Sequence, residues 1–286
     1  MTSEYLNDKI PVRGSCTMTI RNWLGLVIFT MLLTWARSTP LLYEDRPLVI
    51  AHRGASSLAP ENTMAAVYAA LNLGVDMVEV DVHSTLDGEL VVIHDATVNR
   101  TSNGNGYVQR LTLEEVRELD AGSWFRRGFY QEKIPTLREV LEAVKDKSIL
   151  LIELKEPDIE GRTIELVREL DASDQVILQS FDYVQIQKAK QLAPEIHTIF
   201  LVNRPNYGSE PIQAALWMLD IVQTVGASGL SVHYNWCTPE LVSLAAERDV
   251  DVYVWTVNRR SKLRKSVTAG VKGIVTNKPQ TLLSLF

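Results

Sequence analysis

Short apolar runs alternate with longer amphipathic stretches along most of this chain. Eight of the runs are rich in Val, Ile and Leu, as expected for buried β-strands. They lie at 48–51, 77–82, 149–154, 176–179, 198–202, 229–232, 250–256 and 273–275. Helix-like stretches lie between and after them, at 63–73, 137–145, 159–170, 183–192, 210–225, 239–247, 260–269 and 279–285. Eight alternating βα units predict an α/β protein with a closed TIM-type (β/α)8 barrel, and a doubly wound open sheet is the alternative topology.

The alternation is interrupted once, after the second predicted strand. The segment at about 96–136 contains a turn-rich piece at 101–106 and a short helical pattern at 113–119. We therefore expect a small insertion over one end of the barrel, which would occupy residues 47–286.

The amino-terminal part has a different character. Residues 22–36 carry no charge, are mostly apolar, and are bounded by Arg21 and Arg37. Because a bilayer core needs about 20 apolar residues and a signal peptide about 7 to 15, the length favours a signal peptide, with a short membrane anchor as the alternative. We expect residues 1–46 to be a membrane-directed hydrophobic helix and linker. The domain would then be exported or membrane-anchored and lie outside the cytoplasm.

Charge and cysteine content exclude several classes of protein. The 286 residues include 29 basic and 35 acidic side chains, so the net charge of −6 argues against nucleic acid as a partner. The two cysteines, Cys16 and Cys237, cannot build a disulfide framework or a cysteine metal site. Neither a phosphate-binding glycine loop nor a Gly-x-Ser-x-Gly elbow is present.

Acidic residues lie on two neighbouring strands of the predicted barrel. Side chains alternate across a strand, so Glu79, Asp81 and His83 share one face of the second strand. Glu153 and Lys155 share a face of the third strand in the same way. Buried carboxylates need a cation to neutralise them, and three oxygen ligands without cysteine suit Mg²⁺ or Ca²⁺.

Imidazole and cationic groups are expected at the same end of the barrel, where the reacting groups of this fold lie. His52 and Arg53 end the first strand, and His94 starts the insertion. With a metal ion nearby, these groups and Lys155 suit hydrolysis of a phosphodiester. Arg53 and Lys155 would stabilise the phosphoryl oxygens, while one histidine accepts a proton and the other donates one.

Other side chains near the strand ends have weaker assignments. Trp255 ends the seventh strand, where its ring could shield a bound polyol from water. Gln179 and Phe181 are lesser candidates for lining the site. The three remaining histidines are given structural roles: His83, His197 and His233.

Taken in order, the motifs resemble those of the glycerophosphodiester phosphodiesterase family from about residue 48 to 283. The matching pieces include His52-Arg-Gly54, Pro60-Glu-Asn-Thr63, Glu79-Val-Asp-Val-His83, His94-Asp95, Glu153-Leu-Lys155, Trp255-Thr-Val-Asn258 and Gly273-Ile-Val-Thr-Asn277. The resemblance implies a metal-dependent enzyme that cleaves small-molecule glycerophosphodiesters to glycerol 3-phosphate and an alcohol.

The resemblance also implies roles for individual residues. Glu79, Asp81 and Glu153 would bind the metal, and His52 and His94 would be the acid–base pair. Arg53 and Lys155 would contact phosphate. Asn277 stands where many relatives have aspartate; we expect this departure to matter little, because the position closes the eighth strand away from the proposed ligands.

Two other functions compete with this one. A lysophospholipase D or sphingomyelinase D-like activity on membrane lipids would account for the membrane-directed segment. A catalytically silent barrel that serves as a binding module is the second alternative. The sequence leaves open the preferred head group, the choice between Ca²⁺ and Mg²⁺, and whether water or a glycerol hydroxyl attacks the phosphorus.

Overall fold

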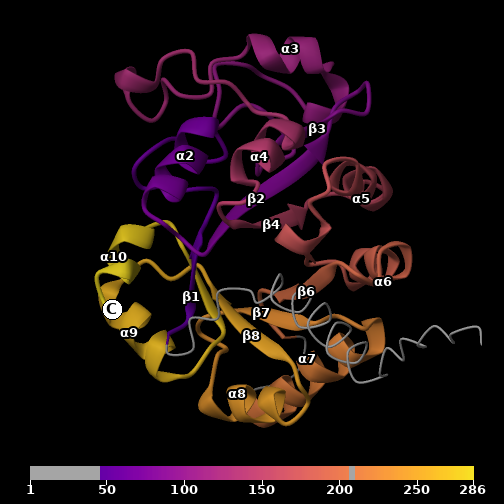
Figure 1. Cartoon of the computed structure of the whole chain (residues 1–286), viewed down its shortest axis with the longest axis vertical. Helices are drawn as coiled ribbons and strands as arrows, with labels where there is room; N and C mark the ends of the chain where they lie inside the picture. Colours follow the sequence, from indigo (N-terminus) through magenta and orange to yellow (C-terminus); the bar gives the residue numbers. More distant parts are fainter. Residues whose placement is uncertain (1–45, 206–209) are drawn as a thin grey trace, which may run out of the picture. The chain divides into compact units, whose positions relative to one another are not determined.

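Eight parallel strands close into a barrel in the computed structural model, which describes residues 46–205 and 210–286 (Figure 1). The strands of the barrel are β1 (Leu48–Ala51), β2 (Met77–Ser84), β4 (Ile149–Leu154), β5 (Val176–Ser180), β6 (His197–Val202), β7 (Gly229–His233), β8 (Asp251–Trp255) and β9 (Gly273–Thr276). The closure comes from β1, which pairs in parallel with both β2 and β9. The predicted TIM-type barrel is therefore confirmed, and the open-sheet alternative is wrong.

Helices on the outside of the barrel agree with the predicted ones to within two residues at each end. They are α2 (Met64–Asn72), α4 (Leu137–Val144), α5 (Glu160–Glu169), α6 (Tyr183–Leu192), α7 (Pro211–Val225), α8 (Pro239–Ala246), α9 (Arg260–Thr268) and α10 (Pro279–Leu283). Local sequence explains where they begin. The hydroxyls of Thr63, Thr136 and Thr238 cap α2, α4 and α8. Proline occupies the first helical position of α7, α8 and α10, where its missing N–H costs nothing.

A ninth strand, β3 (Leu90–Val92), runs antiparallel to the end of β2. The sequence interpretation did not include it, although the Asp87-Gly88 turn before it is a hairpin signal. Its three residues are too few to show the alternation of apolar and polar residues that marks a strand. The insertion follows β3 and contains α3 (Leu113–Glu118) and a small core of its own. That core is made of Val91, Ile93, Val98, Val108, Val116, Ala121 and Ile134.

The barrel interior is apolar at one end and polar at the other. Apolar side chains fill the end where the strands begin: Ile50, Met77, Leu151, Ile177, Ile199, Tyr253 and Val275. Tyr253 fits because Gly273 has no side chain; a Cβ there would lie 2.7 Å from the Tyr253 ring. The polar groups consequently gather where the strands end.

Residues 1–45, which include the predicted hydrophobic helix at 22–36, lie outside the described residues. Within 46–205 and 210–286, no helix is both long and apolar enough to cross a bilayer.

Candidate active site

The chain leaves β1 in a tight turn that carries His52 and Arg53. Arg53 and Gly54 both have left-handed backbone angles, with φ of 56° and 74°. A Cβ at Gly54 would lie 2.6 Å from the Ala66 carbonyl carbon, so only glycine fits. The turn aims the Arg53 N–H at Glu79, whose Oε2 accepts it at 2.8 Å. This strained turn, unusual for an arginine, thereby joins the end of β1 to the carboxylates of β2.

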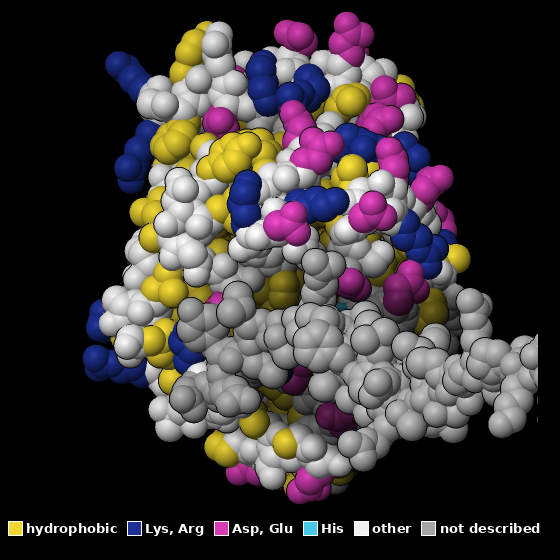
Figure 2. Space-filling view, viewed as in Figure 1, with side chains coloured by type: hydrophobic (Ala, Val, Ile, Leu, Met, Phe, Trp, Pro, Cys, Tyr) yellow, Lys and Arg dark blue, Asp and Glu magenta, His cyan; other side chains and the backbone are white. Residues whose placement is uncertain are grey.

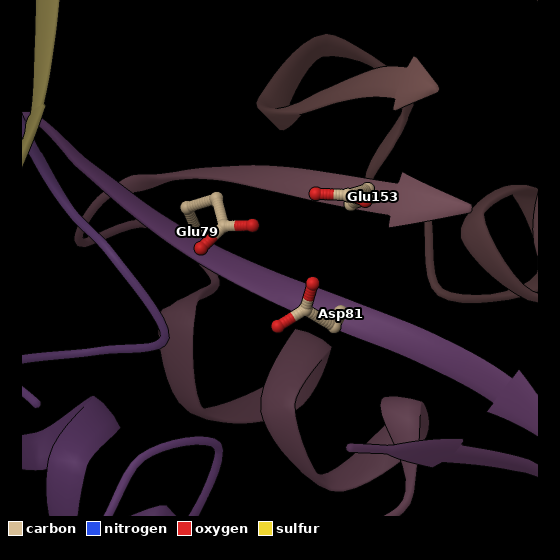
Figure 3. A group of neighbouring side chains, drawn as sticks. All are labelled: Glu79, Asp81 and Glu153. Atoms are coloured by element: carbon tan, nitrogen blue, oxygen red, sulfur yellow. The ribbon is translucent and has the colours of Figure 1, made fainter. Parts of the chain in front are cut away.

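Three buried carboxylates converge beside this turn. Glu79 and Asp81 come from β2 and Glu153 from β4, where Asp81 and Glu153 are direct partners in the parallel pairing. One oxygen from each lies within 4.8 Å of the others. Figure 3 shows the carboxylate groups directed into the space between the two strands. Three oxygens at this spacing could hold one divalent cation, because Mg²⁺ and Ca²⁺ bind oxygen at about 2.0 to 2.6 Å.

Two basic side chains partly balance these acids. Arg53 Nε lies 3.2 Å from Asp81 Oδ2, and Lys155 Nζ lies 2.5 Å from Glu153 Oε1 and 3.4 Å from Asp81 Oδ1. Asn62 Nδ2 donates a hydrogen bond to Asp81 Oδ2 at 2.8 Å. Asp81 Oδ1 is buried and accepts no hydrogen bond from any described residue. The buried acids therefore retain bonding capacity that a cation would use.

The pKa values of the three acids diverge for physical reasons. Burial, and then the charges of Asp81 and Glu153, raise the pKa of Glu79 well above its usual value. Burial and then the charge of Asp81 raise the pKa of Glu153 to about 7. Burial also acts on Asp81, but Arg53 and Lys155 outweigh it and leave the pKa below its usual value. Without a cation, Glu79 and Glu153 thus tend to hold protons, which a divalent ion would displace.

His52 is held by a residue from the far end of the chain. Its Nδ1 donates to Asn277 Oδ1 at 2.6 Å, which leaves the lone pair on Nε2. Burial, and then the charge of Arg53, lower the pKa of His52 to about 4. Asn277 was expected to be of little consequence, yet barrel closure brings β9 beside β1 and places Asn277 against the imidazole.

His94 is held by an acid instead of an amide. Its Nδ1 donates to Asp95 Oδ1 at 2.7 Å, and Arg100 in turn binds both Asp95 oxygens, with Nε 2.7 Å from Oδ2. Arg100 also donates to Glu61, which accepts from Arg53 at 2.7 Å. A chain of ion pairs therefore connects the insertion to the turn after β1.

A pocket of about 110 Å³ lies at this end of the barrel. Its walls include all the predicted site residues except the fully buried Asp81: His52, Arg53, Glu79, His94, Glu153, Lys155 and Trp255. Phe181 and Gln179 also line it, and the Phe181 ring meets Trp255 edge to face with centroids 5.4 Å apart. The pocket thus has an acidic and imidazole-bearing wall opposite an aromatic one.

The remaining histidines lie outside this pocket. His83 is buried, with Nδ1 2.9 Å from Glu156 Oε2 and Nε2 3.2 Å from the His94 carbonyl oxygen. His197 begins β6 and lies at the opposite end of the barrel.

Several residues at the site were assigned no role from the sequence. Glu61 and Asn62 lie in the quoted Pro60–Thr63 motif, so the signal was present without an assignment. Asp95 likewise lies in the His94-Asp95 motif without an assigned role, whereas Arg100 comes from the insertion, where nothing local marks it. Their contacts depend on how the insertion folds over the barrel.

Comparison with known proteins agrees with this geometry. Residues 52–281 match the model of the glycerophosphoryl diester phosphodiesterase family. The chain belongs to this family. A glycerophosphodiester phosphodiesterase of Caldanaerobacter subterraneus subsp. tengcongensis is 42% identical over 246 residues, which are 84% of this chain and 98% of that protein. A second, from Bacillus subtilis, is 33% identical over 275 residues, which are 90% of this chain and 92% of that protein.

Solved structures give the same result. A phosphodiesterase from Oleispira antarctica, in complex with the product sn-glycerol-3-phosphate, has a TM-score of 0.76 and 32% identity, covering 85% of this chain and 97% of that one. A glycerophosphodiester phosphodiesterase from Agrobacterium tumefaciens has a TM-score of 0.73 and 29% identity, covering 83% and 99%. This family member is thus an enzyme, a phosphoric diester hydrolase, and its substrate class is small-molecule glycerophosphodiesters.

Proposed function

We propose that this chain hydrolyses glycerophosphodiesters to glycerol 3-phosphate and an alcohol, with a divalent cation bound by Glu79, Asp81 and Glu153. The observation that carries the proposal is the juxtaposition of three buried carboxylates with two imidazoles in one pocket. A bound divalent cation would supply positive charge against the phosphoryl oxygens. The oxygen-only donor set favours Mg²⁺ or Ca²⁺ over softer metals.

Arg53 and Lys155 are assigned to the phosphate. Both line the pocket and are about one-sixth exposed, so each can reach a bound anion while staying paired with Asp81. Burial lowers the pKa of Lys155, but Asp81 and Glu153 outweigh it and raise the pKa above its usual value. The ammonium group therefore keeps its charge at neutral pH and can stabilise negative charge in the transition state.

His52 is assigned as the base and His94 as the acid. His52 is neutral at pH 7 and has its Nε2 lone pair available, because Asn277 holds the proton on Nδ1. Burial lowers the pKa of His94 below its usual value, and the hydrogen bond to the Asp95 carboxylate opposes this shift by favouring the imidazolium form that an acid needs. One ring would take a proton from the attacking hydroxyl while the other protonates the leaving oxygen.

Trp255 and Phe181 are assigned to the organic part of the substrate. Trp255 Nε1 donates to the Ser231 carbonyl oxygen at 3.3 Å, which orients the indole. The edge-to-face ring pair offers an apolar wall to a polyol or alcohol group and excludes water from it.

A coupled assay tests the activity. Chelator-treated protein is incubated with glycerophosphocholine, glycerophosphoethanolamine and other head groups, with and without restored Mg²⁺ or Ca²⁺, and glycerol 3-phosphate is measured with its dehydrogenase. We expect metal-dependent release, lost in Glu153→Gln and in His52→Ala. Mass spectrometry of products from acylated lipids detects lysophosphatidic acid or a cyclic phosphate, which would indicate the lipid-directed alternative. Absence of turnover with every substrate and metal would favour a silent binding barrel.

We further propose that the apolar stretch at 22–36 takes the domain across or onto a membrane. The support is the uncharged, mostly apolar run at 22–36, which has Arg21 before it and Arg37 after it. Its length and flanking charges are typical of a signal peptide or a short membrane anchor. Cell fractionation combined with sequencing of the mature amino terminus distinguishes cleavage from anchoring. A chain that retains Met1 in the soluble cytoplasmic fraction would contradict both.

A further inference from the structure

The last part of the barrel carries basic side chains and no acidic ones. Residues 252–286 contain seven lysines and arginines and no aspartate or glutamate, in a chain whose net charge is −6. The positive charge is therefore concentrated in one segment, which forms the end of β8, α9, β9 and α10.

Helix α9 carries four of these seven basic residues and exposes three of them. Its buried residues are Leu263 and Ser266, whereas Arg260, Arg264 and Lys265 are exposed. None of these three lies within ion-pair distance of a described carboxylate. By contrast, Arg162 and Arg168 of α5 pair with Glu165 and Glu195. The cations of α9 are thus available to an external anion.

Two recesses flank α9. One, of about 240 Å³, lies toward α8 and is lined by Lys262 and Lys265 together with Tyr234. The other, of about 430 Å³, lies toward α10 and is lined by Arg260 and Arg264. Figure 2 shows Lys and Arg side chains projecting at the lower left edge, where Figure 1 draws α9. Cations therefore line recesses on both sides of the helix as well as its outer face.

The preceding part of the chain joins the barrel close to this helix. Arg46 stacks on Phe286 at 5.3 Å, and Arg260 of α9 donates to Ser284 beside α10. Only nine residues, 37–45, separate the apolar stretch from Arg46. They can span at most about 30 Å. A membrane that holds the apolar stretch would consequently be within reach of α9.

We infer that the exposed face of α9, with the two recesses, docks on an anionic lipid bilayer. Charge complementarity supports this occupant: each basic residue near an anionic surface contributes about 1 kcal/mol, or roughly fivefold in binding. The attachment point of the chain favours a lipid surface over a soluble polyanion. The inference concerns a surface outside the active site, so it stands independently of the proposed reaction.

The test measures vesicle binding by residues 46–286. This part contains the whole barrel and the residues 52–281 that match the family model. The Caldanaerobacter relative, 98% of which is covered, aligns with 84% of this chain. Binding to vesicles of phosphatidylglycerol and phosphatidylcholine is compared with binding to phosphatidylcholine alone, at low and high salt. The test variant is R260Q/R264Q/K265Q. The matched control, R110Q/R126Q/R127Q, removes the same charge from exposed residues of the insertion.

We expect salt-sensitive binding to the anionic vesicles only, reduced on the order of 10²-fold in the α9 variant and unchanged in the control. Equal loss in both variants, or no binding at low salt, would overturn the inference. Equally tight, α9-dependent binding to heparin or DNA would reassign the surface to a soluble polyanion. Circular dichroism and turnover of a soluble diester, both expected to be unchanged, verify that the variants fold.

A second measurement uses the full chain, so that it does not depend on the fragment. An environment-sensitive probe is placed at T268C, an exposed position of α9, after replacement of Cys16 and Cys237 by serine. Quenching by brominated lipid is expected in anionic vesicles and should be several-fold weaker in phosphatidylcholine. Quenching that is absent in both, or equal in both, would contradict an electrostatic docking surface.

Discussion

At the scale of single residues, neighbours decide what each buried acid can do. Glu79 and Asp81 are two residues apart on the same strand, yet their pKa values shift in opposite directions. Asp81 has Arg53, Lys155 and Asn62 around it, whereas Glu79 receives a backbone N–H and faces two other acids. The same side-chain chemistry therefore gives one anion, Asp81, and one acid, Glu79, that would ionise if a cation bound beside it.

Metal affinity should accordingly depend on pH. The ion-free pKa of Glu153 is about 7, so a cation must displace a proton below that pH. We expect the affinity for Mg²⁺ or Ca²⁺ to rise as pH increases from 5.5 to 7.5, with proton release detected by calorimetry in buffers of different ionisation enthalpy. Glu153→Gln should weaken binding by more than about 10- to 100-fold, the usual cost of losing a residue that only orients a ligand, because Glu153 is proposed to bind the cation directly. A pH-independent affinity would contradict the raised pKa of Glu153.

Asn277 should help to determine the pH below which kcat/KM falls, because it contacts His52 and so affects the pKa of that histidine. His52 must be neutral to accept a proton, and its pKa of about 4 keeps it so at ordinary pH. Asn277→Asp places a carboxylate beside Nδ1, which favours the charged imidazolium and raises the pKa of His52. We expect the acid limb of kcat/KM against pH to move upward by about one unit or more. An unmoved limb would mean that His52 is not the base, and Asn277→Ala serves as the uncharged comparison.

At the scale of elements, tight turns and the insertion hold the site together. The turn after β1 uses left-handed angles at Arg53 and Gly54, and the same region contains Asn62 at φ 56°. The insertion contributes Asp95 and Arg100 to the ion-pair chain. These elements are irregular because they position side chains instead of extending the sheet.

Two glycines with positive φ should tolerate alanine differently. Gly54→Ala would place a Cβ 2.6 Å from the Ala66 backbone at φ 74°, whereas Gly88→Ala would meet nothing within 4 Å at φ 82°. We expect Gly88→Ala to cost about 1 kcal/mol of unfolding free energy from backbone strain, and Gly54→Ala more than twice as much because a clash is added. Urea unfolding measures both; equal losses would show that the close approach to Ala66 is unimportant.

Asp120 should stabilise the insertion in a pH-dependent way. It is buried and accepts hydrogen bonds from the N–H groups of Gly122, Ser123 and Gln131. Burial opposes ionisation, but these bonds and that of the Ser123 hydroxyl outweigh it and hold the pKa well below its usual value. Because the pKa of Asp120 is lower in the folded than in the unfolded state, its charge stabilises the fold above about pH 3.9, the usual pKa of an aspartate. This stabilisation is lost as the pH falls from that value through the folded-state pKa.

Asp120→Asn should therefore destabilise the protein at pH 7 by about 1 to 3 kcal/mol, because an amide accepts fewer bonds than a carboxylate. The difference from wild type should begin to shrink toward pH 3, because the unfolded-state carboxyl takes up a proton there while the folded-state carboxyl is still ionised. Urea unfolding at both pH values measures it. A difference that is equal at pH 7 and pH 3 would show that the charge of Asp120 is not what matters.

At the scale of the whole molecule, barrel closure assembles the site from distant parts of the chain. The pocket draws on β1, β2, β4, β5, β8 and β9 and on the insertion, all within residues 46–286. The basic face of α9 lies on the outer wall, away from the chemistry. The pocket and the proposed membrane-docking surface are thus different parts of the fold, so one can be altered without the other.

Residues 46–286 alone should keep the activity on a soluble diester. Because all the described residues that line the pocket lie within this part, we expect its kcat/KM for glycerophosphocholine to be within about twofold of the full chain, a difference of about 0.4 kcal/mol in the barrier. Activity on acylated lipid in vesicles should fall if the membrane attachment presents that substrate. A loss of more than tenfold on the soluble diester would mean that residues 1–45 contribute to the site.

The periodicity of this sequence determined the eight barrel strands, their helices and the shared face of Glu79 and Asp81, because alternation and amphipathicity are local properties. It could not determine β3, which is too short to show a period. Nor could it determine the bond between His52 and Asn277, 225 residues apart, or the chain from Arg53 through Glu61 to Arg100. These contacts, and the opposed pKa values they produce, depend on barrel closure and burial, which only the tertiary structure decides.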